Sequence, residues 1–203
     1  MAYDKMNPAI EPSMVQDGQG VATQRLHWWR QAWTTAEAAT GAAIHAAITL
    51  GAAAQTVTTN LIQPTCARGL TMTMGKAEEI DQPVVITGTN INGDVISETI
   101  TSDHSNGTTP VAGVKCFKTI TSIALPVRKQ ATTPTCTLTT TDLLGLKLIL
   151  PAAACVFATY LNGTLEATAA TVTVDADEIE KNTVDLNSSL NGTAVVAIGY
   201  IYS

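Results

Sequence analysis

The chain has 203 residues, of which 45% are hydrophobic and only 14% are charged, and its formal net charge is −6. A chain of this length can bury roughly 70% of its unfolded surface, so its core needs neither a metal nor a disulfide. The eleven Lys and Arg residues are scattered along the chain, which excludes the clustered positive charge typical of nucleic-acid binding. A charge content below the roughly 25% of average domains predicts a surface that is neutral and polar, or covered by partners.

The first 41 residues differ from the rest of the chain. Residues 1–24 are polar, contain two prolines and two glycines, and show neither helical nor strand periodicity, so we predict an extended N-terminal arm over residues 1–41. Residues 34–40 could form one or two turns of helix within it. The start of the chain lacks the charged and then apolar layout of a signal peptide, so we expect no membrane insertion and assembly in the cytoplasm.

All three tryptophans lie together after this polar stretch, at Trp28, Trp29 and Trp33. A buried Trp removes about 150–250 Å² from water, worth about 4–6 kcal/mol as an upper bound. Left in water, the three rings would form an aggregation-prone patch. Two interpretations stay open: the rings fill one end of the chain's own core, or they anchor it to a neighbouring subunit. The second makes Trp28, Trp29, Trp33, Arg25 and Arg30 the candidate partner-binding residues.

From residue 42 onward the sequence changes to short runs rich in β-branched residues, separated by turn signals. We predict an all-β fold over residues 42–203, an antiparallel β-sandwich or a jelly-roll-like barrel. Two closely packed β subdomains, with a boundary near residues 126–135, are the alternative organisation. The predicted strands cover residues 43–50, 55–62, 68–75, 83–89, 94–101, 114–123, 135–140, 144–150, 156–161, 171–174, 183–186 and 194–202.

Four Asn-Gly pairs mark turns, because this dipeptide tolerates the two positive φ angles of a type I′ hairpin. The pair at residues 92–93 predicts a hairpin of residues 84–91 and 94–100, and the pair at 162–163 predicts one of residues 157–161 and 164–168. The alternation of apolar residues assigns five side chains to the core: Phe117, Ile120, Ile123, Phe157 and Leu161. The four cysteines lie singly in apolar stretches without C-x-x-C spacing, so we predict buried small hydrophobes, with a disulfide or metal site as the weaker alternative: Cys66, Cys116, Cys136 and Cys155.

The sequence offers no set of residues that predicts catalysis. The three histidines lie far apart, and no nucleophile elbow, phosphate-binding loop, dinucleotide fingerprint or H-E-x-x-H pattern occurs. The acidic stretch at residues 175–180 lacks the spaced ligands and central glycine of an EF-hand loop, so a solvated loop is the preferred interpretation. The same holds for Glu78, Glu79 and Asp81. We therefore expect no enzymatic activity, no cofactor and no metal site.

Two parts of the chain resemble structural proteins of tailed-bacteriophage heads. The first comprises residues 86–90 through Gly93, Ile96-Ser97-Glu98-Thr99-Ile100 and the segment of residues 110–123 that ends in Lys-Cys-Phe-Lys-Thr-Ile-Thr-Ser-Ile. The second comprises residues 144–146, 160–163, 171–175 and 182–186. Together they cover roughly half of the chain, and the arm with its tryptophans lies outside them.

This resemblance implies a decoration or cement protein on the exterior of the capsid. Its expected partners are the major capsid protein and neighbouring copies of itself, in a dimer or trimer on the shell. Such a protein stabilises a shell by mass action, because it binds only the assembled form. Two other virion roles are the alternatives: a head fibre or host-surface adhesin module, and a tail-tube or connector subunit.

Overall fold

The computed structural model describes residues 13–14, 25–34 and 43–202. Within these ranges the regular elements are antiparallel strands and two 3-10 helices, η1 (Ala153–Cys155) and η2 (Ile179–Lys181), without an α-helix. The predicted all-β class is confirmed. The predicted arm lies outside the described residues up to residue 24, apart from Ser13–Met14, and the predicted helical turns lie outside them from residue 35.

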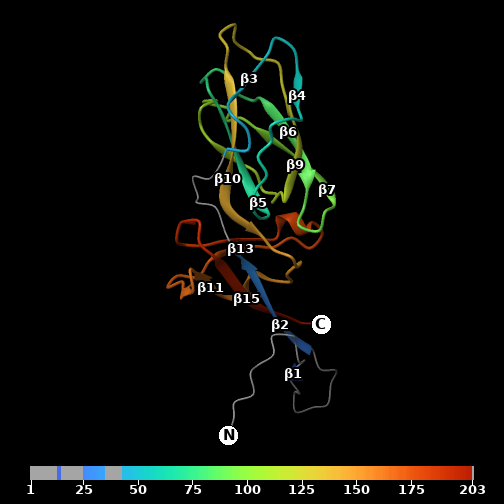
Figure 1. The fold of residues 1–203 in the computed structure, drawn as a ribbon, viewed down its shortest axis with the longest axis vertical. Helices are drawn as coiled ribbons and strands as arrows, with labels where there is room; N and C mark the ends of the chain where they lie inside the picture. The colour runs from blue at the N-terminus through green and yellow to red at the C-terminus, as the bar shows by residue number, and fades with distance from the viewer. Residues whose placement is uncertain (1–12, 15–24, 35–42, 203) are drawn as a thin grey trace.

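The strands form three sheets, each held together by antiparallel pairs (Figure 1). Sheet A has the order β1 (Ser13–Met14), β2 (Arg25–Trp33), β15 (Val195–Tyr202), β11 (Val156–Leu161) and β12 (Thr164–Leu165). Sheet B has the order β13 (Thr171–Thr173), β14 (Thr183–Asp185), β10 (Thr135–Gly145), β5 (Arg68–Met74) and β8 (Val111–Ala112), with β3 (Ile48–Thr49) also paired to β10. Sheet C has the order β4 (Gln55–Val57), β9 (Thr119–Leu125), β6 (Pro83–Thr89) and β7 (Val95–Thr101).

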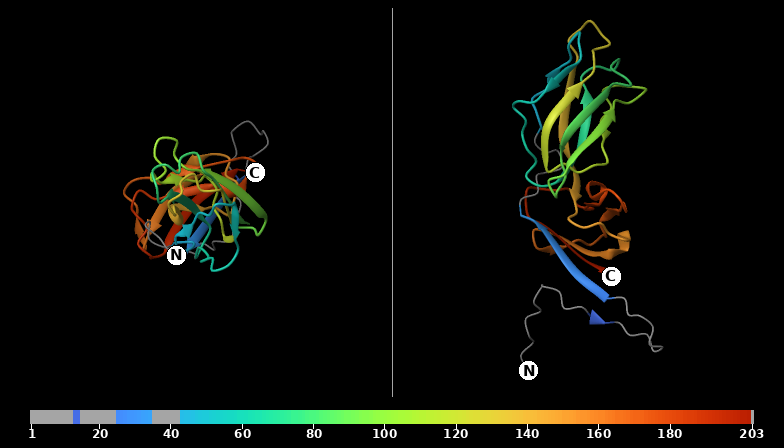
Figure 2. Two further views of the ribbon diagram at one scale, coloured as in Figure 1. Left: turned by 90° about the horizontal axis from the view of Figure 1, so that it is seen from above. Right: turned by 90° about the vertical axis from the view of Figure 1, so that its right-hand side faces the viewer.

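Two separate hydrophobic cores divide the described residues into two lobes, stacked along the long axis in Figure 2. In the N-terminal lobe, residues 43–140, sheet C packs on β3, β5 and the first half of β10. In the C-terminal lobe, residues 144–202 together with β2, sheet A packs on β14 and the end of β10. The antiparallel sandwich character that the sequence predicts is confirmed. Along β10, residues up to Leu138 belong to the N-terminal core and residues from Leu144 belong to the C-terminal core. Strand β2 packs in the C-terminal lobe although it precedes the N-terminal lobe in the sequence.

Strand β10 runs through both lobes and contributes residues to both cores. It pairs with β5 up to Thr140, and the register then shifts before Leu144 pairs with Arg68 of β5 and with β14. The guanidinium of Arg68 is fully buried and its Nε donates to the carbonyl of Thr141, 2.8 Å away, inside the shifted segment. A buried arginine thus satisfies the backbone where the ladder is interrupted.

Both predicted hairpins are confirmed, in the pairs β6–β7 and β11–β12. Asn162 and Gly163 have φ angles of 50° and 78°, as a type I′ turn requires. At the other hairpin the type I′ prediction is wrong, because only Gly93 has a positive φ, 92°. There the side chain of Asn90 accepts hydrogen bonds from the backbone N–H groups of Asn92 and Asp94, which favours a wider turn closed by a left-handed glycine.

The predicted core is confirmed in the N-terminal lobe, where Phe117, Ile120 and Ile123 are buried. Leu161 is half-buried against the C-terminal core. The prediction for Phe157 is wrong, because its side chain is 51% exposed. The register between β11 and β15 shifts between Val156 and Ala158, so Phe157 is an extra residue that breaks the alternation and turns outward.

The cysteines form no disulfide, and three of the four are buried, as predicted, while Cys66 is half-buried. Burial raises the pKa of the Cys136 thiol to about 12 and also raises that of Cys116. These two thiols therefore stay protonated at neutral pH and serve as small hydrophobic side chains.

Candidate functional site

Strand β2 carries the tryptophans and presents them on two opposite faces of sheet A. Successive side chains of a strand alternate between faces, so Trp29, Gln31 and Trp33 share one face while Trp28 and Arg30 share the other. The burial along β2 follows this alternation. The structure therefore does not bring the three tryptophans together, although they are close in sequence.

The inward face stabilises the C-terminal lobe. Trp33 is 4% exposed and belongs to its core, against which Trp29 packs half-buried. Between them Gln31 donates from Nε2 to the carbonyl of Gly145 at 2.9 Å and accepts from the backbone N–H of Lys147 at 2.8 Å. Both indole N–H groups lack a hydrogen-bond partner among the described residues, so burial of apolar area holds these rings in place.

The outward face carries an exposed aromatic cluster, which we define as Trp28, Phe157 and Tyr200. The three residues come from the neighbouring strands β2, β11 and β15. The ring centroids of Trp28 and Phe157 lie 5.3 Å apart at 88°, and Tyr200 lies 6.3 Å from each of them. Even within this cluster Trp28 is 45% exposed and Phe157 is 51% exposed, while Tyr200 is half-buried and also packs against the C-terminal core. Exposed aromatic groups of this kind are typical of protein interfaces.

A cavity with a mixed polar and apolar lining lies beside the three rings. Its volume is about 260 Å³, and it is lined next to Phe157 by the exposed side chain of Leu165 on β12, by Glu166 and by three alanines: Ala167, Ala169 and Ala170. The cluster and this cavity form one face of the C-terminal lobe that a partner could cover.

Of the candidate residues, Trp28 and Arg30 lie on this exposed face, and Trp29 and Trp33 lie on the opposite one. The side chain of Arg25 lies outside the described residues, and its backbone pairs with Met14. Sequence reasoning missed Phe157 and Tyr200 as members of the face. The register of β15 against β2 places Tyr200 opposite Trp28, and this register is seen only in the paired strands.

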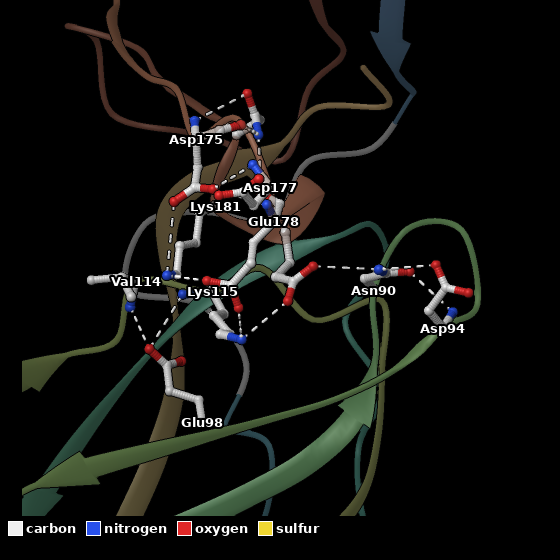
Figure 3. Close-up of polar contacts among 11 residues, drawn as sticks. Asn90, Asp94, Glu98, Val114, Lys115, Asp175, Asp177, Glu178 and Lys181 are labelled. Atoms are coloured by element: carbon white, nitrogen blue, oxygen red, sulfur yellow. Dashed lines mark hydrogen bonds and ion pairs between the residues drawn. The ribbon is translucent and has the colours of Figure 1, made fainter. Parts of the chain in front are cut away.

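A second site lies where the two lobes meet, and it joins residues 98–115 to residues 178–182. The carboxylate of Glu98 on β7 accepts hydrogen bonds from the backbone N–H groups of Val114, at 2.6 Å, and Lys115, at 3.3 Å (Figure 3). A Cβ atom on Gly113 would collide with this carboxylate, so glycine leaves the space that the carboxylate occupies. Residues 98–100 and residues 113–115 thus pack against each other.

A second glycine also sets the packing of the N-terminal lobe. A Cβ atom on Gly88 would collide with the carbonyl oxygen of Thr119 on β9 and crowd the ring of Phe117. The Thr-Gly-Thr and Phe-Lys-Thr segments therefore meet across β6 and β9.

The side chain of Lys115 extends from the N-terminal lobe to two carboxylates of the C-terminal lobe. Its Nζ forms ion pairs with Glu178 and, at 3.1 Å, with Glu180. Lys181 pairs with Glu178 as well. The loop that presents these groups is organised by Asn182, whose fully buried amide donates to the carbonyls of residues 175 and 178 and accepts from two backbone N–H groups.

The pKa directions follow from these contacts. Burial alone would lower the pKa of Lys115, but the hydrogen bonds to Glu178 and Glu180 outweigh it and the pKa is raised. Hydrogen bonds from Lys115 and Lys181 lower the pKa of Glu178. Burial raises the pKa of Glu98 in spite of its two backbone donors. The ion pairs of Lys115 therefore stabilise the fold above the unfolded pKa of glutamate and below that of lysine.

The expectation that both acidic stretches are solvated loops is wrong for two residues. Glu180 is buried at the junction, and Glu79 is 0% exposed. The Glu79 carboxylate accepts from the backbone N–H groups of Lys129 and Gln130 and from the amide of Gln82. A buried carboxylate is tolerated here because several donors surround it.

Replacing Glu79 with alanine should lower the free energy of unfolding by about 2–3 kcal/mol, because it leaves buried backbone donors without an acceptor. The neighbouring Glu78 is exposed, so the Glu78→Ala variant is the matched control and should lie within about 0.5 kcal/mol of the parent. Urea denaturation followed by circular dichroism measures both. Equal losses for the two variants would show that the Glu79 contacts contribute nothing specific.

The described residues contain no group of three or more His, Cys, Asp or Glu side chains placed to hold a metal ion. No described helix has the length and apolar character needed to cross a bilayer. The arrangement is one of surfaces and packing contacts, and the aromatic cluster is its best candidate for binding a partner. Comparison with protein-family models, curated proteins and solved structures gave no match for this chain.

Proposed function

We propose that this chain is a structural virion protein that binds and stabilises the assembled capsid of a tailed bacteriophage, from the outside of the shell. The major capsid protein and neighbouring copies of the chain are its partners, and the aromatic cluster is the surface that docks on them. Because the protein binds the assembled shell and not its separated subunits, binding makes disassembly less favourable.

The exposed aromatic cluster is the observation that carries the docking role. Two large rings remain about half exposed on a sheet face, at 45% for Trp28 and 51% for Phe157, where a protein without a partner would gain from covering them. Aromatic residues of this kind contribute most of the binding energy in many interfaces. The class of partner rests on the resemblance to phage head proteins, which is carried by segments within residues 86–123 and by four short segments within residues 144–186.

The geometry of the rings favours a protein partner over a flat carbohydrate. Phe157 and Tyr200 are stacked at 24°, but Trp28 meets them edge to face, at 88° and 69°, so the three rings form no single flat platform. A stacking site for sugar rings needs open, parallel ring faces. This supports shell binding over an adhesin role.

The test is a variant in which both exposed rings are replaced, Trp28→Ser with Phe157→Ser. We expect its affinity for shells stripped of the protein to fall about 30-fold or more, since loss of a central aromatic anchor costs 2 kcal/mol or more. Co-sedimentation of purified protein with stripped particles measures the affinity. The matched control is Val95→Ser with Val127→Ser, two exposed apolar side chains of the N-terminal lobe, and it should bind as the parent does.

Four outcomes contradict the proposal. Parent protein that does not sediment with shells removes the capsid role. Binding to host cells in place of shells supports an adhesin, and a ring of fixed size in solution supports a tail-tube or connector subunit. Equal binding by the double Ser variant and the parent removes the aromatic cluster as the docking surface.

A further inference from the structure

The two lobes have distinct cores, and of the N-terminal lobe only Cys66 packs against the C-terminal core, so contacts other than a shared hydrophobic interior hold the lobes in one orientation. Strand β10 connects them, but its pairing with β5 is interrupted between Thr140 and Leu144. A strand with an interrupted ladder bends more readily than a fully paired one. The relative orientation of the lobes therefore depends on contacts beside this strand.

On the N-terminal side of the junction, the backbone of Lys115 is held in place by Glu98. Glu98 accepts from the N–H groups of Val114 and Lys115, and Gly113 leaves the space that the carboxylate occupies. Glu98 belongs to β7, whose neighbours Ile96 and Ile100 lie in the N-terminal core. The start of the Lys115 side chain is thus fixed to that core.

On the C-terminal side, the ion pairs end on the carboxylates of Glu178 and Glu180, which lie just before β14 in the sequence. Glu180 lies in η2, and its backbone carbonyl accepts from the N–H of Cys116 at 2.8 Å. Its carboxylate also lies 3.4 Å from the Asn90 amide, in the β6–β7 turn (Figure 3). The side chains of Lys115 and Glu180 are 17% and 7% exposed, so water screens their attraction less than that of a surface pair.

We propose that Lys115, Glu178 and Glu180 form a latch that locks the two lobes into one rigid and cooperative unit, with the interrupted segment of β10 as the hinge. The latch acts within one chain and does not depend on the identity of any partner. With the latch removed, each lobe keeps its own core, but the two lobes unfold separately and vary in orientation.

The distribution of aromatic residues allows each lobe to be followed by itself. The N-terminal lobe contains neither Trp nor Tyr, since the three tryptophans lie in β2 and the four tyrosines lie at Tyr3, Tyr160, Tyr200 and Tyr202. Trp fluorescence therefore reports on the C-terminal lobe alone. Far-UV circular dichroism reports on the strands of both lobes.

The experiment compares urea unfolding by these two signals in the full chain, in Lys115→Met and in the milder Glu180→Gln. In the parent, the two transitions should coincide, as for a single cooperative unit. In Lys115→Met, the midpoints should separate, and small-angle X-ray scattering of the folded variant should show a broader distribution of interatomic distances. Lys115→Arg should restore coincidence in part, and the exposed Lys76→Met is the matched control for loss of one positive charge.

The alternative results overturn the latch. If the parent already unfolds in two separate transitions, the lobes are not locked. If Lys115→Met and Glu180→Gln unfold in single coincident transitions at lower urea, the ion pairs add stability without controlling the coupling. If both variants fail to fold in either lobe, the lobes do not keep independent cores.

Discussion

Replacing Phe117 with alanine is expected to lower the free energy of unfolding by about 3–5 kcal/mol. Phe117 is 0% exposed and supplies the only aromatic ring in the core of the N-terminal lobe. It packs close to Gly88, where β6 and β9 pair, so its removal leaves a cavity between strands that cannot move closer together. The cavity adds to the transfer free energy that the lost ring contributes.

Phe157→Ala is the matched control, because it removes the same side chain from a site that is 51% exposed. Its effect on the free energy of unfolding should stay below about 1 kcal/mol, since little apolar area is removed from a packed environment. Urea denaturation followed by far-UV circular dichroism measures both variants. A larger loss for Phe157→Ala than for Phe117→Ala would show that the register of β11 is misassigned.

The pair Trp33→Ala and Trp28→Ala separates the two interpretations of the tryptophan cluster. Trp33 is buried in the C-terminal core, so its replacement should lower the free energy of unfolding by about 3–5 kcal/mol. Trp28 lies on the opposite face of the same strand and is 45% exposed, so its replacement should lower it by about 1 kcal/mol or less. Trp33 fills the chain's own core, and Trp28 is the ring that the proposed function assigns to a partner.

Thermal and urea unfolding of the two variants, followed by circular dichroism, measure this difference. Shell binding, assayed on the folded Trp28→Ala variant, then reports on docking without a change in stability. If both tryptophan variants lose the same stability, β2 is not a strand with two distinct faces. If Trp28→Ala unfolds as the parent does and still binds as tightly, Trp28 is not an anchor.

Features that depend on near neighbours in sequence could be predicted from the sequence alone. The Asn-Gly pairs predicted the hairpins β6–β7 and β11–β12, because turn geometry depends on two residues and their flanks. The alternation of β-branched residues predicted the all-β class and the burial of Phe117, Ile120 and Ile123. Single cysteines in apolar stretches predicted buried thiols.

The candidate site could be predicted only in part. The sequence singled out the tryptophans, but it could not divide them between a core and a surface, because both interpretations bury rings of the same kind. It placed Phe157 in the core because a regular strand alternates, and the shifted register of β11 on β15 broke that rule. It interpreted Glu79 and Glu180 as solvated, because the donors that surround Glu79 come from residues about fifty positions away.

The sequence by itself determined the β class, the hairpins and most of the N-terminal core of this protein, since these depend on local turn preference and on period-two alternation. The tertiary structure alone decided three things: the place of the division between two lobes, inside β10 and not near residues 126–135, the aromatic cluster of Trp28, Phe157 and Tyr200, and the ion pairs of Lys115. Each of these depends on the register between strands far apart in the chain. Register is a property of pairs of strands, and a one-residue shift in it moves a side chain from core to surface.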